Sequence, residues 1–357
     1  MAAFRTCRVT EIIETSDDIV RAKVDSDNGP IEAIGWPRML GSLSEGDRVV
    51  VNTTGLELDL GTGGAGFILW NLDGDGAVEP GPGHIMKMRY TPWQTEVLAV
   101  DAPESAHHER LKETRSIAGM PVVVCGLHSQ VAGAVAGIKA ARPAARIGYL
   151  MTDGAALPIG WSDLVRHLRR SELLDITCTS GHAFGGELEV VNVYSGLVAL
   201  REIGEVDAVV VAMGPGVVGT DTVLGFTGIE QGPLLDAVTA LEGAAIACLR
   251  ISFVDQRERH LGISHHSLTT LALAARERCT VVMPELRDER QELLQDQLRA
   301  AGIYDRHDVV VRDGGEGLRL LASKGLKPSS MGRTIDETPE LFVSASAAGA
   351  EAASRLT

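Results

Sequence analysis

The segment that decides the fold runs from Met120 to Met151 and reads MPVVVCGLHSQVAGAVAGIKAARPAARIGYLM. It contains an apolar run at Val122–Cys125, a helical stretch at Gln130–Ala141 and a second apolar run at Ile147–Met151. Short uninterrupted apolar runs are typical of strands buried on both faces, and a helix is the usual connection between parallel strands. The segment therefore predicts a strand, helix and strand unit of a parallel sheet.

The same alternation continues to about residue 335. Helical stretches, among them Leu188–Ile203 and Ser267–Arg278, lie between or after most of the strand-like runs. The further strand-like runs are Asp175–Thr179, Ala208–Met213, Ala245–Ile251, Thr280–Met283 and Val309–Val311. This pattern predicts an α/β fold with a doubly wound, mostly parallel, Rossmann-like sheet that carries helices on both faces.

Residues 1–100 show a different pattern, with six short β-branched runs separated by turns rich in Gly, Asp and Ser. The sixth of these runs is His84–Met88, and one of the turns is Gly61–Gly66. Such a segment predicts a small N-terminal β-barrel of the OB or SH3 type. The expected organisation is a barrel at 1–100, a polar linker helix at 101–119, the α/β domain at 120–335 and an Ala/Ser-rich tail at 336–357.

The composition of the 357 residues limits the classes of partner. A formal net charge of −15 argues against nucleic acid and against anionic membranes. The five cysteines form no C-x-x-C pair, which fits a reducing cytoplasm, and neither a signal peptide nor a membrane-spanning run is expected. Extra apolar helical runs such as Val190–Leu200 favour a homo-oligomer, most simply a two-fold dimer.

Ligands of doubly wound sheets bind beyond the carboxyl ends of the strands, and one such end here is unusual. The stretch 251–270 reads ISFVDQRERHLGISHHSLTT and contains three of the ten histidines of the chain. Ser264 is placed to cap a helix, which puts His265 and His266 in its first turn, where the positive helix end disfavours protonated imidazole. Neutral imidazole binds metal or accepts a proton, whereas Arg257 and Arg259 suit a phosphate or carboxylate. The alternative is a polar loop whose charges pair with each other.

Other strand ends supply further polar residues, notably Asp153 and the glycine-rich segment Gly181–Glu187. If all strand ends meet at one edge, His182 and His265 face the same crevice. The candidate catalytic set is His182, His265, His266, Asp153, Glu187 and Asp255. Oxygen and nitrogen ligands suit a divalent metal such as zinc or manganese, with His182, His260 and His265 as candidate ligands. The spacing matches no HExxH motif, so pairing among the pocket residues themselves is the alternative.

The loop Gly214-x-Gly216-x-x-Gly219 matches the dinucleotide fingerprint only weakly, because the glycines and Pro233 that follow it oppose an immediate helix. A loop whose backbone N–H groups hold an anion and a purely structural turn are both compatible with it. The candidate ligand-binding residues are Arg257, Arg259, Gly214, Gly216, Gly219 and Thr220.

Five strings are distinctive: GPGHIMKMRYTP from Gly81, GHAFGGELEVVNVYSGL from Gly181, VAMGPGVVGT from Val211, GFTGIEQG from Gly225 and DQRERHLGISHHSLT from Asp255. With these motifs the chain resembles an uncharacterised bacterial family that is known only as a domain of unknown function. The resemblance extends from the N-terminal barrel to Met331–Arg333. It implies no activity, cofactor or catalytic residue.

Three functions remain open from the sequence. The first is a small-molecule enzyme that uses metal-assisted hydrolysis, with the polar residues at the strand ends as its site. The second is a non-catalytic sensor of an anionic metabolite, and the third is an oligomeric scaffold.

Overall fold

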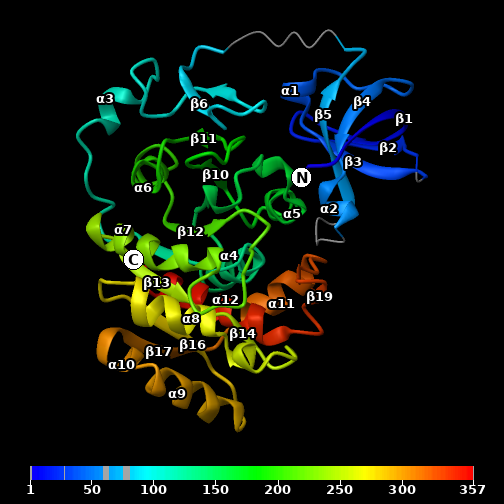
Figure 1. The fold of residues 1–357 in the computed structure, drawn as a ribbon. Helices are drawn as coiled ribbons and strands as arrows, with labels where there is room; N and C mark the ends of the chain where they lie inside the picture. The colour runs from blue at the N-terminus through cyan, green and yellow to red at the C-terminus, as the bar shows by residue number, and fades with distance from the viewer. Residues whose placement is uncertain (1, 28, 59–63, 75–80, 357) are drawn as a thin grey trace. The chain divides into compact units, whose positions relative to one another are not determined.

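The computed structural model describes all residues except 1, 28, 59–63, 75–80 and 357. The chain forms two compact units, Met1–Leu98 and Ala99–Thr357, which are described separately (Figure 1). The predicted fold class is confirmed, because an N-terminal barrel precedes a doubly wound α/β sheet. Part of the Gly61–Gly66 turn expected from the sequence lies outside the described residues.

The first unit is built on a closed five-stranded barrel, which is the strand number of an OB-fold. The strand order is β1-β2-β3-β5-β4, with β3 and β5 parallel and the other pairs antiparallel. Alternate residues of the strands, such as Val49 and Val51, point into the barrel and are fully buried. The strands are β1 (Phe4–Thr15), β2 (Val20–Asp25), β3 (Ile31–Gly35), β4 (Arg48–Asn52) and β5 (Ala65–Asn71).

The sixth run predicted for the barrel lies outside it. The strand β6 (Ile85–Lys87) pairs instead with β7 (Thr95–Val97) in a separate antiparallel sheet. Met88 and Tyr90 have positive φ values of 49° and 63°, so the chain turns back directly after β6. This reversal gives β6 a local partner.

The second unit contains an eight-stranded sheet in which every pair is parallel. Its order is β11-β10-β9-β12-β8-β13-β16-β17, so the first strand of the unit, β8, lies inside the sheet. The predicted helix at Leu188–Ile203 is wrong at its start, because Leu188 and Glu189 pair with β10 and add an eighth strand. The strands are β8 (Pro121–Val124), β9 (Ile147–Thr152), β10 (Ile176–Thr179), β11 (Leu188–Glu189), β12 (Ala208–Met213), β13 (Ala244–Cys248), β16 (Thr280–Pro284) and β17 (Asp308–Arg312).

Helices cover both faces of this sheet, and each face has its own apolar core. One core contains side chains of α4 (Gln130–Ala141), α5 (Asp163–Arg170), α11 (Gly315–Ser323) and α12 (Pro339–Ser354). The opposite core contains side chains of α6 (Val193–Glu202), α7 (Gln231–Ala240), α8 (His265–Thr269), α9 (Arg290–Ala300) and α10 (Ile303–Arg306). The strands between them are apolar on both sides, as the uninterrupted runs of the sequence indicate.

The Ala/Ser-rich segment that begins at Asp336 forms a final helix, and this helix packs on the second unit. Its helix α12 packs closely along α4 and is buried over most of its length (Figure 1). Small residues permit this approach. A Cβ added at Gly137 would lie 2.1 Å from the carbonyl oxygen of Ser346, and one added at Gly349 would lie 2.1 Å from that of Ala134.

The segment 101–119 also differs from the predicted linker helix. It is helical only at α3 (His108–Leu111), and its apolar residues Leu111 and Ile117 belong to the core of the second unit. The Ile117 N–H donates to the carbonyl of Leu241, which ties the segment to the end of α7. Within the part of the chain that the structure describes, no helix is both long enough and apolar enough to cross a membrane.

Candidate functional site

The topological switch point of the sheet lies at β8, where the connections to neighbouring strands run on opposite faces; the pocket at this place is called the switch-point pocket. The loop after β8 leads to α4 on one face, whereas the loops after its neighbours β12 and β13 lead to α7 and α8 on the other face. Loops that leave adjacent strands for opposite faces open a crevice at the carboxyl edge, and ligands of such sheets bind there.

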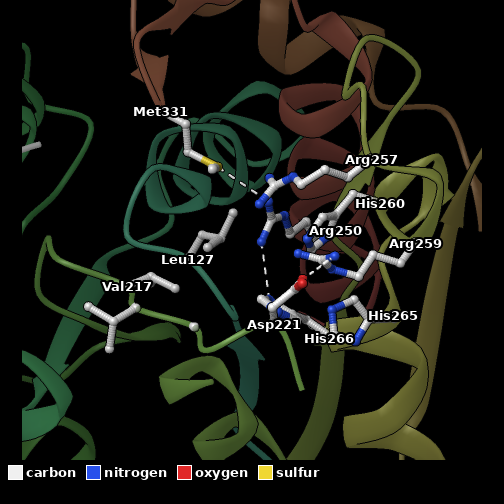
Figure 2. Close-up of a pocket in the computed structure, with 12 residues that line it drawn as sticks. Leu127, Val217, Asp221, Arg250, Arg257, Arg259, His260, His265, His266 and Met331 are labelled. Carbon is white, nitrogen blue, oxygen red and sulfur yellow. Dashed lines mark hydrogen bonds and ion pairs between the residues drawn. The ribbon is translucent and has the colours of Figure 1, made fainter. Parts of the chain in front are cut away.

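A pocket with a volume of about 120 Å³ occupies this crevice (Figure 2). Leu127 contributes from the loop after β8, and the other lining residues come from the loops after β12 and β13, from α8 and from Met331. The full lining is Leu127, Val217, Val218, Gly219, Asp221, Arg250, Arg257, Arg259, His260, His265, His266 and Met331. Because about 10–15 Å³ of such a volume is enough to hold one water molecule, the pocket has room for a compact ligand group together with several waters.

Two buried glutamines fix the floor of the crevice. The side-chain amide of Gln231 donates to the carbonyls of Val124 (2.7 Å) and Cys248 (2.9 Å), the last residues of β8 and β13. The amide of Gln130 donates to the carbonyl of Leu249 (2.8 Å), and its oxygen accepts from the N–H of Leu127 (3.1 Å). These bonds satisfy backbone groups that would otherwise be buried without partners at the diverging strand ends.

Arg250 comes next in the chain after Cys248 and Leu249, whose carbonyls belong to this floor. Of the three arginines in the pocket, it is the one whose charge has no carboxylate partner among the described residues. Its side chain is buried, with the residue 7% exposed. Its guanidinium donates to Nδ1 of His266 (3.1 Å) and contacts Sδ of Met331 (3.2 Å). Among the described residues, no carboxylate forms an ion pair with it. Burial, together with the nearby Arg257, lowers the pKa of Arg250 to about 10, so the group is still charged at neutral pH.

The other two arginines of the pocket each have an acidic partner. Arg257 forms a bidentate pair with Asp255, with distances of 2.8 and 2.9 Å, and Arg259 pairs with Asp221. The Arg257 guanidinium holds the pKa of the Asp255 carboxyl well below its usual range. The two pairs cancel in charge, which leaves the pocket with the positive charge of Arg250.

Three histidines form a cluster in the same pocket, each with one ring nitrogen within 4.8 Å of those of the other two. His260 comes from a 3₁₀ turn at Glu258–His260, and His265 and His266 begin α8. The predicted cap is confirmed, because the Ser264 hydroxyl accepts from the N–H of His266 (3.2 Å). The ring of His266 stacks on Phe226 at a centroid distance of 4.0 Å.

All three imidazoles are held in the neutral form at neutral pH. Burial is the main cause, and the nearby Arg250 guanidinium adds to it, so the pKa of His260 falls to about 4 and that of His266 to about 3. The pKa of His265 is also lowered, by burial first and then by Arg259. The sequence predicted neutral imidazoles from the helix end, whereas burial and arginines are the causes in the structure.

The remaining predicted catalytic residues do not line this pocket. Glu187 accepts from Arg169 (2.8 Å) and from the N–H of Thr177 (2.9 Å), so it holds α5 and β10 together. Asp153 begins a short 3₁₀ turn after β9, and His182 lies in the turn after β10. His182, expected to share a site with His265, belongs neither to the pocket lining nor to the histidine cluster.

The glycine-rich loop contributes only its far end to the pocket. Gly219 lines it, whereas Gly214 and Gly216 do not. The Thr220 hydroxyl interacts with the Thr222 hydroxyl (3.1 Å) and the Gly225 carbonyl (3.2 Å), so it stabilises its own loop. The loop thus acts as one wall of the pocket.

Six residues of the pocket were absent from the predicted site: Leu127, Val217, Val218, Asp221, Arg250 and Met331. A signal for Arg250 exists in the sequence, because it interrupts the apolar run Ile246–Phe253. A charged residue inside a buried strand region is rarely accidental. No comparable pattern marks Asp221 or Met331.

Outside the pocket, at the ends of β9 and β12, Glu230 is a partly buried carboxyl with a strongly shifted pKa. Glu230 accepts from the Thr152 hydroxyl (2.7 Å). Burial raises the pKa of Glu230 to about 7, and the neighbouring Asp153 carboxylate adds to this effect. This carboxyl therefore titrates near neutral pH.

Comparison with known proteins identifies the family but no activity. Residues 32–349 match the family described as "Protein of unknown function (DUF3866)", and the chain belongs to this family. No curated protein matches the sequence. The resemblance inferred from the sequence motifs is thereby confirmed.

Proposed function

We propose that this protein is a small-molecule enzyme whose substrate carries a phosphate or carboxylate group, which binds at Arg250 in the switch-point pocket. The observation that carries the proposal is the buried guanidinium of Arg250, which has no carboxylate partner among the described residues. A buried charge without a partner is costly, and an anionic ligand would supply the missing partner. The small volume of the pocket favours recognition of one compact group.

The neutral histidines favour an enzyme over a sensor. Nε2 of His265 is buried and has no hydrogen-bond partner among the described residues. A neutral imidazole at the edge of an anion site is suited to take a proton from water or from a substrate hydroxyl. Hydrolysis of an ester of the bound anion is therefore the reaction that this pocket supports best.

Binding is tested first, by calorimetric titration of the full chain with sulfate and with inorganic phosphate. Arg250→Gln should lose this binding, whereas Arg278→Gln should not, because Arg278 is a surface residue paired with Asp308 at 2.8 Å. Equal binding by all three proteins would place the anion elsewhere.

Turnover is tested next, with p-nitrophenyl phosphate and p-nitrophenyl acetate as general ester substrates. We expect activity that His265→Gln reduces by about 10²-fold or more, the usual contribution of a general base. If anions bind at Arg250 and none of a wide panel of phosphate and carboxylate esters is turned over, the second function, a non-catalytic sensor of an anionic metabolite, takes its place.

A further inference from the structure

The histidine cluster has the composition of a metal site. The ring centroids of His260 and His265 lie 5.0 Å apart, those of His260 and His266 also 5.0 Å, and those of His265 and His266 4.4 Å. Nitrogen ligands at about 2.0–2.1 Å from a tetrahedral zinc ion lie roughly 3.3 Å from one another. The ring nitrogens all lie within 4.8 Å of one another, so they would have to approach by no more than about 1.5 Å to hold such an ion.

The surroundings of two of the rings leave a nitrogen available. Nδ1 of His260 is 2.7 Å from the Ser264 hydroxyl, the kind of second contact that orients metal-binding histidines and leaves Nε2 as the ligand. Nε2 of His265 is buried and has no hydrogen-bond partner among the described residues. A buried ring nitrogen without a hydrogen-bond partner is a position at which a ligand can bind.

The third ring is engaged by Arg250, and this contact links the metal to the anion. Nδ1 of His266 accepts a hydrogen bond from Arg250 (3.1 Å), which uses the lone pair of one nitrogen and leaves the proton of the neutral ring on the other. His266 can therefore coordinate a metal only after Arg250 gives up this bond. Arg250 would then be released toward the anion.

We propose that His260, His265 and His266 bind a divalent transition metal of the zinc class, and that metal and anion bind to this pocket cooperatively. The proposal rests on the same pocket as the proposed function and changes the role of His265 in it. With a metal bound, His265 would be a ligand and not the general base, and the metal would instead supply a bound water of lowered pKa. Three imidazoles without a thiolate favour zinc or cobalt over calcium or magnesium. A fourth, open coordination position is typical of catalytic rather than structural zinc sites, and here it would be available to the anion.

Charge gives the reason for cooperativity. A dication alone would meet the uncompensated charge of Arg250, so the metal-loaded pocket would be strongly positive. An anion placed between the metal and Arg250 removes this repulsion, and by linkage each ligand must raise the affinity for the other by the same factor.

The test is a titration of the chelator-treated full chain with CoCl₂, followed by the visible absorption of tetrahedral cobalt and by calorimetry. We expect one ion per chain in the wild type. His265→Ala should weaken binding by about 100-fold or more, because losing a ligand costs at least as much as the 10–100-fold seen when a partner of a ligand is removed. The matched control is His182→Ala, a histidine that also follows a strand of the sheet but lies outside the cluster, and it should bind as the wild type does.

Cooperativity is measured by repeating the titration in sulfate, which keeps cobalt in solution. Cobalt affinity should rise at least about 5-fold, the lower end of typical coupling between sites. Arg250→Met should keep cobalt binding and lose the effect of sulfate. If sulfate leaves cobalt affinity unchanged in the wild type, the coupling is wrong.

The outcomes separate this inference from the proposed function. Sulfate binding without any cobalt binding overturns the metal site and leaves the anion site standing. Cobalt binding that survives His265→Ala, or that is lost in His182→Ala, overturns the assignment to these three histidines. If cobalt binds but sulfate binds neither to the metal-free nor to the cobalt-loaded protein, both the anion site and the coupling are wrong.

Discussion

Replacing Arg250 by methionine should make the protein more stable and unable to bind anions. Burial lowers the pKa of Arg250 to about 10 from its ordinary value of 12.5, which corresponds to about 3 kcal/mol of cost to the charged form in the folded protein. Since the folded pKa still lies far above neutral pH, the folded protein bears this cost throughout the neutral range. Methionine removes the charge but also the hydrogen bond to His266, worth about 1 kcal/mol. The expected net gain is about 2 kcal/mol.

Urea unfolding followed by circular dichroism measures this gain, and a sulfate series separates stability from binding. The wild type should gain about 2.7 kcal/mol from binding when sulfate reaches 100 times its dissociation constant. Arg250→Met should gain only the smaller, non-specific stabilisation that sulfate gives to folded proteins. The variant is thus expected to be the more stable protein without sulfate, and the wild type should equal or exceed it with sulfate. Arg257→Met is the control. It leaves the carboxylate of Asp255 buried and unpaired, and should cost roughly 1–3 kcal/mol in either buffer.

Two results would refute this reasoning. If Arg250→Met unfolds at lower urea than the wild type in buffer without anions, Arg250 stabilises the fold and its burial is no sign of a missing partner. If sulfate stabilises the variant as much as the wild type, the anion binds elsewhere on the protein.

Four further substitutions test other parts of the second unit by urea unfolding. Glu230→Gln should stabilise the protein by roughly 3 kcal/mol at pH 8 and little at pH 4. The raised pKa of Glu230 means that its protonated form stabilises the wild type below pH 4.5 and that this contribution is lost as pH rises to about 7. An equal effect at both pH values would contradict this. Gly216→Ala should cost about 1 kcal/mol or more, since φ is +115°, whereas Gly219→Ala should leave stability unchanged and narrow the pocket. Gly137→Ala should cost about 1–3 kcal/mol, because the added methyl meets the Ser346 carbonyl, and wild-type stability would mean that α4 and α12 can separate.

The fold class could be predicted because its signals are local. The buried runs of β8 and β9, with a helix between them, specify a parallel unit wherever they occur in a chain. The two-residue strand Leu188–Glu189 has no such signal, since it is a strand only by its pairing with β10. The same holds for segment 101–119, where propensity favours a helix but Ile117 is anchored in the core and bonded to Leu241.

The candidate site was predictable to the extent that its residues are neighbours in sequence. His260, His265, His266 and the two paired arginines lie within one loop and the helix that follows it, so the sequence already placed them together. The positions of other strand ends depend on the strand order, which periodicity does not give. His182 follows β10, and two strands, β9 and β12, separate β10 from β8 at the switch point. Its distance from the pocket follows from this order.

The hydrogen bonds of the crevice floor are the reason why we expect Arg250 to be replaceable although it is buried. The backbone at the ends of β8 and β13 is held by Gln130 and Gln231, whose amides satisfy three strand-end carbonyls without any contribution from the Arg250 side chain. The Arg250 N–H is likewise held, by the Ser267 hydroxyl at 2.9 Å. A guanidinium that supports none of this network is free to be positioned for something other than stability. Proteins tolerate such a cost mainly where a site must be organised before its ligand arrives. We therefore propose that the floor, the charge of Arg250 and the neutral histidines beside it belong to one prearranged binding site.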